Sequence, residues 1–358
     1  MDKAAQMFGK IACFLFLVAI FIIGKYTGEN KTKYSSNLNG AADSVNISDY
    51  MPAVEEKETL GNYTLTTSTT VVNLRNLGPF DFLPNHKNPC WRRIESIKTL
   101  KRCIPYFYLI GCEKCGSSDL WYRLVQHPEI AATDKENFHW ISKTRFHGLP
   151  FEFYLDWFQA AVEGNISKTD SKGYHPMIIG DGNPSMNTYN EYWMLDPANH
   201  DTFLEPHFTN ADNIYFLNPK AKIIAILREP VERLFSEYNY FARNQTSAKF
   251  HGVVSKMKDL FEECRRTHTD RYCVNTKKPE QSSIGQIWKG LYYVHLGEFY
   301  RVFPKEQILV LKLDDCKINY DECLHRTFKF LEISPVTEEF YKALNTNYTV
   351  KKYETISG

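Results

Sequence analysis

The sequence has almost no net charge and no visible internal repeat. Its 358 residues include 43 Lys and Arg against 42 Asp and Glu, so the formal net charge is only +1 at pH 7. No long-range field therefore attracts nucleic acid, and we expect no nucleic-acid partner. An anionic ligand must instead be bound by local clusters of charge. The length allows two domains, or one large α/β domain with a tail.

The sequence also lacks a long hydrophobic run. Its one uncharged apolar stretch, residues 11–24 (IACFLFLVAIFIIG), has fourteen residues and lies between Lys10 and Lys25. A bilayer span needs about 17 to 25 residues, but flanking lysine side chains can reach the interface. No small-x-small cleavage site follows. We expect an uncleaved signal anchor at 11–24 behind a cytoplasmic tail at 1–10. A cleaved signal peptide and a soluble helix are the alternatives.

Glycosylation sequons indicate that most of the chain lies in the secretory lumen. There are six of them, at Asn30, Asn46, Asn62, Asn165, Asn244 and Asn347. The first three lie in residues 25–88, a polar stretch with little apolar periodicity, which predicts a flexible luminal stem.

The cysteine count agrees with an oxidising compartment. Apart from Cys13 in the expected anchor, eight cysteines remain, which is an even number. The spacings favour bridges from Cys264 to Cys273 and from Cys316 to Cys323, with Cys90 to Cys103 as a third candidate, although a sequence alone does not determine the pairing.

From residue 89 onward, apolar strands alternate with amphipathic helices. The patterns predict strands at 104–111, 176–180, 222–227 and 307–313, and helices at 117–129, 151–164, 230–241, 284–304 and 320–333. This alternation predicts an α/β fold with a parallel sheet and helices on both faces. Ligands of such folds bind at the carboxyl ends of the strands.

Three interpretations compete for the stretch YLIGCEKCGSSDLWYRL (108–124). Cys112 and Cys115 form a C-x-x-C, which suggests thiol redox chemistry at a helix N-terminus. Gly111 and Gly116 bracket a short loop between a strand and a helix, which suggests anion binding. The third is a plain turn. The phosphate loop is favoured, because the redox interpretation leaves the Gly-Ser-Ser run unexplained.

This loop differs from a standard ATPase loop. The two glycines have the Walker A spacing, but Ser117 stands where the lysine belongs, and Lys114 lies inside the loop instead. Ser117 and Ser118 add hydroxyl donors at the helix start.

A second anion-binding element is the segment AILREPVERLFSEY. Arg228 leaves a buried strand, Pro230 opens a helix, and Ser236 lies eight residues after the arginine, where it can share a side of the helix with Arg228. Together with the first loop, these residues predict a ligand with two phosphate groups. Arg233 and Glu237 have the spacing of an ordinary surface ion pair.

The two elements together carry a family resemblance. EKCGSSDL resembles the 5′-phosphosulfate loop of Golgi sulfotransferases, and LREPVERLFSEYNYF resembles their 3′-phosphate element. The similarity extends through GLYYVHLGEFYRVFPKEQILVLKLDD and covers roughly residues 107 to 332. The chain is similar in particular to carbohydrate sulfotransferases of the N-acetylgalactosamine 4-sulfate 6-O-sulfotransferase type.

The resemblance implies a sulfotransferase fold and a catalysed sulfuryl transfer. The donor would be 3′-phosphoadenosine 5′-phosphosulfate, the acceptor a sulfated polysaccharide such as chondroitin or dermatan sulfate, and the location the Golgi membrane, as a single-pass type II protein. No metal would be needed, since a lysine and a helix N-terminus can stabilise the developing charge.

The resemblance also implies residue roles. Lys114 would contact the bridging oxygen of the phosphosulfate, and its 5′ group would be bound by Cys115, Gly116, Ser117 and Ser118. Arg228 and Ser236 would hold the 3′-phosphate. In DKENFHW (134–140), Glu136 would be the base that takes the proton of the sugar hydroxyl, with His139 as second candidate. Asp181, in GDGNPS (180–185), and Lys289 would contact the acceptor.

Two departures from the family pattern are visible. Glu113 stands where many members have a proline, and a carboxylate beside an anion cradle opposes donor binding unless it points away. In relatives a basic loop closes over the nucleotide and the chain then continues. Lys351 and Lys352 correspond to that loop and would bind the nucleotide, so we expect the domain at 89–358 to be incomplete at its C-terminus. Two alternatives follow: a catalytically impaired sulfotransferase-like binding protein, or a luminal thiol oxidoreductase using Cys112 and Cys115.

Overall fold

The computed structural model describes residues 59–60, 63–64, 71–95, 98–131, 133, 138–200, 205–242, 246–276 and 285–344. None of the helices in these ranges is long and apolar enough to cross a membrane. The expected anchor at 11–24, most of the expected stem, and the sequons other than Asn165 lie outside the described residues.

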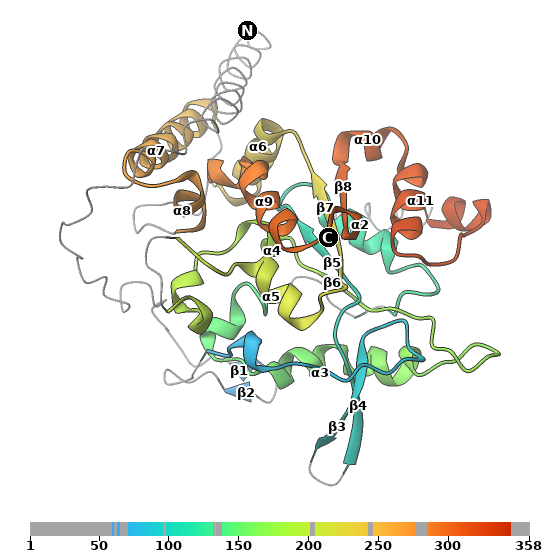
Figure 1. Ribbon diagram of the computed structural model, residues 1–358. Helices are drawn as coiled ribbons and strands as arrows, with labels where there is room; N and C mark the ends of the chain where they lie inside the picture. The colour runs from blue at the N-terminus through green and yellow to red at the C-terminus, as the bar shows by residue number, and fades with distance from the viewer. Residues whose placement is uncertain are drawn as a thin grey trace.

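A four-stranded parallel sheet forms the centre of the fold (Figure 1). The strand order is β6-β5-β7-β8, and every neighbouring pair is parallel. Its strands are β5 (Phe107–Gly111), β6 (Gly180–Gly182), β7 (Lys222–Leu227) and β8 (Ile308–Lys312). The parallel α/β sheet expected from the sequence is therefore confirmed, because continuous apolar runs are typical of strands covered on both faces.

One strand is displaced from its predicted position. A strand was expected at 176–180, but β6 begins only at Gly180. Ile178 instead forms a bridge with Ile130, outside the main sheet. At Gly180 and Gly182 a side chain would collide with the Phe107 and Trp121 rings, at 2.2 Å and 2.5 Å from the nearest ring atoms. The two glycines therefore allow the backbone to reach its place beside β5.

Helices cover both faces of the sheet because alternate residues of each strand face opposite sides. Tyr108 and Ile223 belong to one buried cluster and Phe107 and Ile224 to another. The first cluster contains residues of α3 (Phe151–Ala161), α5 (Asn210–Leu217) and α9 (Tyr292–Val302). The second contains residues of α2 (Ser117–Leu124), α10 (Leu313–Ile318) and α11 (Tyr320–Phe330).

The remaining helices are α4 (Ser185–Thr188), α6 (Pro230–Phe241), α7 (Ser247–Arg265) and α8 (Asp270–Asn275). The bounds of α6 confirm those predicted from Pro230. By contrast, the single helix predicted at 284–304 is wrong. The chain forms a 3₁₀ turn at Ile287–Gly290 and only then α9. The carbonyl of Gln286 accepts a hydrogen bond from Arg233 at 3.0 Å, besides the i→i+3 bond of the 3₁₀ turn from the Lys289 amide at 3.3 Å.

The ion pair predicted between Arg233 and Glu237 is present, but its predicted position on the surface is wrong. Both side chains are fully buried and contact each other through Nη1 and Oε2 at 2.5 Å. Glu237 also accepts a hydrogen bond from the Gln286 amide at 3.3 Å. The segment that contains Gln286 covers this side of α6, which no local pattern in the sequence reveals.

Residues 71–88, which belong to the expected flexible stem, already pack against the fold. Leu74, in a 3₁₀ turn at Leu74–Asn76, is 1% exposed and belongs to the first buried cluster. The buried side chain of Asn88 accepts a hydrogen bond from the Ile179 amide at 2.8 Å.

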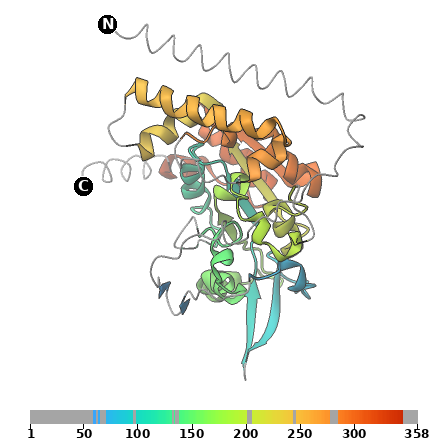
Figure 2. The same ribbon diagram turned by 90° about the vertical axis from the view of Figure 1, so that its left-hand side faces the viewer.

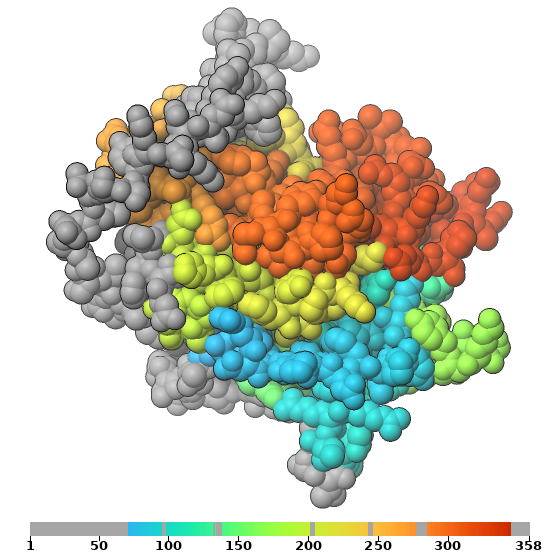
Figure 3. All heavy atoms as spheres, in the orientation of Figure 1, coloured from blue at the N-terminus to red at the C-terminus, as the bar shows by residue number. Residues whose placement is uncertain are grey.

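An antiparallel hairpin of β3 (Cys90–Glu95) and β4 (Lys98–Cys103) projects from the body of the molecule (Figures 1 and 3). Figure 2 shows it at the end of the molecule opposite α7. Earlier in the chain, β1 (Thr59–Leu60) pairs with β2 (Tyr63–Thr64) in an antiparallel arrangement.

The four disulfides of the described residues join Cys90 to Cys103, Cys112 to Cys115, Cys264 to Cys273, and Cys316 to Cys323. The three pairings favoured by the sequence spacing are therefore confirmed. The fourth, within the C-x-x-C, was treated as incidental.

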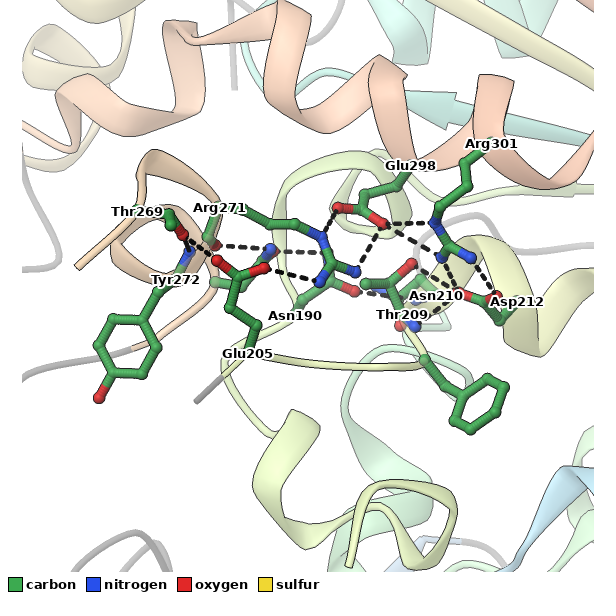
Figure 4. Close-up of polar contacts among 12 residues, drawn as sticks. Asn190, Glu205, Thr209, Asn210, Asp212, Thr269, Arg271, Tyr272, Glu298 and Arg301 are labelled. Atoms are coloured by element: carbon green, nitrogen blue, oxygen red, sulfur yellow. Dashed lines mark hydrogen bonds and ion pairs between the residues drawn. The ribbon is translucent and has the colours of Figure 1, made fainter. Parts of the chain in front are cut away.

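A chain of ion pairs fastens α9 to its neighbours (Figure 4). Glu298 on α9 binds Arg271 of α8 through two contacts of 2.5 Å and 3.0 Å. Arg271 also reaches Glu205 at 3.3 Å, and Arg301 of α9 reaches Asp212 of α5 at 3.0 Å. These contacts hold α9 in place, and the turn that leads into it forms part of the site described below.

Gly111→Ala tests the closest backbone approach in this fold. Gly111 has φ +100°, and an added Cβ would lie 2.5 Å from the Cα and the carbonyl oxygen of Pro184. We expect the free energy of unfolding to fall by at least about 2 kcal/mol in denaturant titration. The control is Gly297→Ala, in α9, where nothing lies within 4 Å. That change should stabilise the protein by up to about 1 kcal/mol, and equal effects at the two glycines would contradict the packing described here.

Candidate active site

The two predicted anion-binding elements meet at the carboxyl ends of neighbouring strands. The amide of Cys112, just after β5, donates to the carbonyl of Ile226 in β7 at 2.9 Å. Nη1 of Arg228, just after β7, donates to the carbonyl of Lys114 at 3.4 Å. The parallel register of β5 and β7 therefore brings the two loops into direct contact.

The loop from Gly111 to Gly116 has the backbone of an anion cradle. Gly111, Lys114 and Gly116 all have positive φ, at 100°, 62° and 84°. Gly116 is the N-cap of α2 and offers no side-chain cap, so the first amides of the helix keep their hydrogen-bonding capacity for a ligand. Ser117 is buried and Ser118 is exposed at this helix start. The arrangement places both hydroxyl-bearing residues beside the free amides.

Lys114 points toward α6. Its ammonium lies 3.6 Å from the ring centroid of Tyr240, a cation–π contact. Burial lowers the pKa of Lys114, and the positive charge of Arg228 lowers it further. Two cations held this close, without a described carboxylate ion-paired to Lys114, are an arrangement that an anion would stabilise.

Arg228 has spare hydrogen-bonding capacity. Its Nε is buried without a hydrogen-bond partner, and its Nη2 makes only a long contact of 3.6 Å with Glu232. Arg228, Glu232, Ser236 and Tyr240 follow one another at intervals of four residues. Glu232, Ser236 and Tyr240 therefore lie along one side of α6, with Arg228 just before its N-cap, and the joint role of Ser236 and Arg228 stays a prediction. An unsatisfied buried donor beside Lys114 fits a phosphate group.

Tyr292 secures the junction of the two loops. Its hydroxyl donates to the carbonyl of Arg228 at 2.8 Å. The same oxygen lies 3.6 Å and 3.7 Å from the sulfurs of Cys112 and Cys115. The start of α9 therefore contacts both anion-binding elements at once.

Glu113 has a charged partner, which resolves the apparent conflict with the anion cradle. Its carboxylate forms an ion pair with the ammonium of Lys289. The Lys289 side chain is 8% exposed and the Glu113 side chain 24%. The structure therefore brings Lys289 to the site, as its predicted role requires, but with its ammonium bound to the loop rather than free.

His139 lies within the electrostatic influence of Glu113. It has φ +56°, and its Nδ1 is 2.8 Å from Oγ of Ser185. That hydroxyl donates to Asn183 at 2.7 Å and also contacts Ser142. Burial lowers the pKa of His139, while the charge of Glu113 acts in the opposite direction. A neutral imidazole whose Nδ1 is held by a hydroxyl is suited to accept a proton at Nε2.

The structure separates Asp181 from these groups. Its carboxylate is buried on the α3 side of the sheet and accepts a hydrogen bond from Tyr154 at 2.7 Å. Burial raises its pKa from the usual 3.8 to about 7. Its acceptor-binding role stays a prediction. Three other candidate residues, Glu136, Lys351 and Lys352, lie outside the described residues.

Three residues of the site were not found from the sequence. Tyr240 was identifiable in principle, because it continues the four-residue spacing of Arg228 and Ser236. Ser185 lies in the quoted GDGNPS segment, where only Asp181 was selected. Tyr292 gave no local signal, since its contacts are with residues far away in the chain. Among the described residues, no group of three His, Cys, Asp or Glu side chains could hold a metal ion.

Comparisons with known proteins agree with this geometry. The family described as "Sulfotransferase domain" matches residues 105–355. Carbohydrate sulfotransferase 15 of Homo sapiens is 33% identical over 319 residues, which cover 73% of this chain and 56% of that protein. Its Mus musculus counterpart is 34% identical over 296 residues, covering 77% and 52%. The chain thus spans about half the length of the curated relatives it matches.

Among solved structures, a sulfotransferase from Alicyclobacillus acidocaldarius superposes with a TM-score of 0.44 at 19% identity. The superposition covers 69% of this chain and 92% of that one.

Removing Lys289 tests the ion pair with Glu113. Lys289→Met leaves a half-buried carboxylate without its partner, so the free energy of unfolding should fall by about 1 to 3 kcal/mol. Glu113→Gln in the same chain should restore most of this loss, because the double variant has no unpaired charge. Denaturant titration of the two single variants and the double variant measures the coupling. Strictly additive losses would rule out the pair.

Asp181→Asn tests the buried carboxyl. The unfolded chain loses the Asp181 proton near pH 4, whereas the folded chain retains it up to about pH 7. The stability of the native protein should therefore fall as pH rises from 4 to 7, by on the order of 3 kcal/mol, and stay level above that. The variant should lack this component, because the amide does not titrate and can still accept from Tyr154. Unfolding curves with equal pH dependence for the two proteins would contradict the assignment.

Proposed function

The chain belongs to the sulfotransferase domain family, and on that premise we propose that it is a carbohydrate O-sulfotransferase. The donor would be 3′-phosphoadenosine 5′-phosphosulfate and the acceptor a sugar hydroxyl. One observation carries the proposal: Lys114 and Arg228 converge from neighbouring strand ends, and the buried Nε of Arg228 has no partner. Two cations beside an uncapped helix start form a site for a ligand with several anionic groups.

The donor site follows from the same geometry. The amides and hydroxyls at Gly116, Ser117 and Ser118 would bind the 5′-phosphosulfate, and Arg228 with Ser236 the 3′-phosphate. The fit rests on the positive-φ loop and on the orphaned donor of Arg228. The bound donor supplies an activated sulfuryl group.

Lys114 would stabilise the negative charge that develops on the leaving oxygen. Its position over Tyr240 keeps the ammonium near the cradle, and its charge needs no rearrangement of water during transfer.

Two residues are candidates for the base. Glu136 is the first by resemblance, and His139 is the second. Burial favours the neutral imidazole of His139, and its Nδ1 contacts the hydroxyl of Ser185. The charge of Glu113 acts on the same ring. Glu113 would then stabilise the imidazolium that forms when His139 takes the proton of the acceptor hydroxyl.

For the acceptor, we propose a glycosaminoglycan such as chondroitin or dermatan sulfate. The support is the identity with carbohydrate sulfotransferase 15 over most of this chain. For the location, we propose the Golgi membrane, with the domain in the lumen and residues 11–24 as the anchor. The disulfides of the described residues fit an oxidising compartment.

A thiol oxidoreductase is the second candidate, since a disulfide does join Cys112 to Cys115 at the start of a helix. Both cysteines are 0% exposed, however. A disulfide whose sulfurs an external thiolate cannot reach is poorly suited to exchange, which favours the transferase.

Titration calorimetry with 3′-phosphoadenosine 5′-phosphate tests the donor site. The native protein should bind it with micromolar affinity. Arg228→Ala should weaken binding by about 10- to 100-fold, because a charge-assisted contact to a phosphate is lost. Arg266→Ala is the control, since this arginine is 72% exposed and pairs only with Glu263 on the surface.

Binding without turnover separates the enzyme from an impaired binding protein. Lys114→Ala should abolish sulfuryl transfer to a chondroitin 4-sulfate hexasaccharide and retain most of the nucleotide affinity. A folded native protein that binds no nucleotide would refute the transferase proposal.

A further inference from the structure

The hairpin of β3 and β4 concentrates positive charge in a nearly neutral protein. Its residues 90–103 (CWRRIESIKTLKRC) contain five Lys and Arg and one Glu. The disulfide between Cys90 and Cys103 closes its base. It lies at the amino ends of the sheet strands, because β4 leads directly into β5, whereas the candidate active site lies at their carboxyl ends. Figure 1 shows the hairpin projecting away from the sheet.

The two faces of the hairpin differ in how their charges are compensated. On the face toward α3, Arg93 pairs with Glu152 at 2.8 Å and Arg102 with Asp156 at 2.7 Å. On the opposite face, Arg92 stands directly across from Lys101 in the strand register. Neither forms an ion pair with a carboxylate of the described residues, and the Lys101 ammonium contacts only the Ser167 hydroxyl at 3.4 Å. Like charges in directly opposite positions destabilise a hairpin.

Two histidines extend this uncompensated face. The rings of His86 and His175 stack at 3.8 Å between centroids. Burial and then the charges of His175, Lys101 and Arg92, in that order, together lower the pKa of His86 to about 4. The electrostatic influence of both hairpin cations thus reaches His86. A surface that holds this much positive charge together at a cost to stability has the signature of a binding site.

A cleft adjoins the hairpin. It has a volume of about 360 Å³, at the lower end of the range for ligand sites. Phe80, Trp91 and Phe151 line it, together with Asp81 and with Arg93, whose charge is paired with Glu152. Flat apolar rings beside arginines suit a sugar ring that carries anionic substituents. Arg92 lies along the cleft between Trp91 and Arg93, but the alternation of the strand turns its side chain to the uncompensated face, so the cleft and that face adjoin across β3.

We propose that the uncompensated face of the hairpin and the adjoining cleft form a second binding site for sulfated polysaccharide, separate from the transfer site. Sulfate groups would contact Arg92 and Lys101, and a sugar ring would occupy the cleft beside Trp91. The proposal deepens the proposed function and rests on it for the class of polymer. The site would hold a long acceptor chain or its carrier near the enzyme and raise the local concentration of acceptor at the carboxyl-end loops.

The test compares Arg92→Ala/Lys101→Ala in the full chain with the native protein. Binding to immobilised chondroitin 4-sulfate polymer is measured over a range of salt concentrations. We expect at least about tenfold weaker binding and a shallower salt dependence, because two cation–sulfate contacts are lost. Arg266→Ala/Lys305→Ala is the matched control, with the same charge change on side chains that are 72% and 83% exposed elsewhere. The control should bind like the native protein.

A second readout separates this role from a structural one. Arg92→Ala/Lys101→Ala should raise KM for the polymer and leave kcat and the KM for a hexasaccharide unchanged. Its thermal midpoint should equal or exceed that of the native protein, because the like-charge repulsion is gone. Arg92→Lys/Lys101→Arg, which keeps both charges, should retain polymer affinity.

The outcomes distinguish this proposal from the transferase proposal. If the native protein transfers sulfuryl groups and the alanine variant binds polymer unchanged, the hairpin site is wrong and the enzyme stands. If the native protein binds no nucleotide but binds polymer through the hairpin, the reverse holds. Hairpin-dependent binding to phosphatidylserine vesicles without binding to the polymer would overturn the polysaccharide in favour of a lipid surface.

Discussion

The parallel pairing of β5 with β7 is the constraint on which the candidate site depends. It places the ends of two strands side by side, so that the loop with Lys114 and the loop with Arg228 touch through a single hydrogen bond. The close approach of Gly111 to Pro184 fits the first loop against the end of β6. Tyr292 then ties the same junction to α9. A shift in the register of β5 and β7 would move Lys114 away from Arg228 and remove the anion-binding site.

Compensation of charge organises the rest of the molecule. Buried cations such as Arg233 have a carboxylate partner at short range, and the chain of pairs through Arg271 fixes α9. Glu113 follows the same rule through Lys289. Against this background, three of the cations that lack a described carboxylate partner are informative: Lys114 in the cradle, and Arg92 and Lys101 on the hairpin. A charge that is buried or crowded without a partner destabilises the fold, and a bound anion would remove that cost. In a protein with a net charge of only +1, these three cations are therefore the sites where we expect anions to bind.

Local patterns predicted the elements whose formation is decided locally. The apolar run at 222–227 became β7 with the expected bounds, and Pro230 opened α6 where expected, because continuous burial and a helix-starting proline leave few other conformations. The helix predicted at 284–304 failed at its start, where Gln286 binds Arg233 and Glu237, 53 and 49 residues away in the chain, and only a 3₁₀ turn forms. Arg233 and Glu237 were misjudged for the same reason, since the spacing of a pair carries no information about what covers it.

The sequence by itself determined the α/β class, the two anion-binding loops and the resemblance on which their roles rest, because each depends on neighbouring residues. Three of the four disulfides were also candidates from the sequence, although the structure decided their pairing. Only the tertiary structure decided what surrounds those residues. It placed Lys289 beside Glu113, Tyr240 next to the ammonium of Lys114, and Tyr154 against the carboxylate of Asp181. It also left one face of the hairpin with uncompensated positive charge. The physical reason is that charge, burial and pKa depend on neighbours in space, and chain folding brings those neighbours from distant positions.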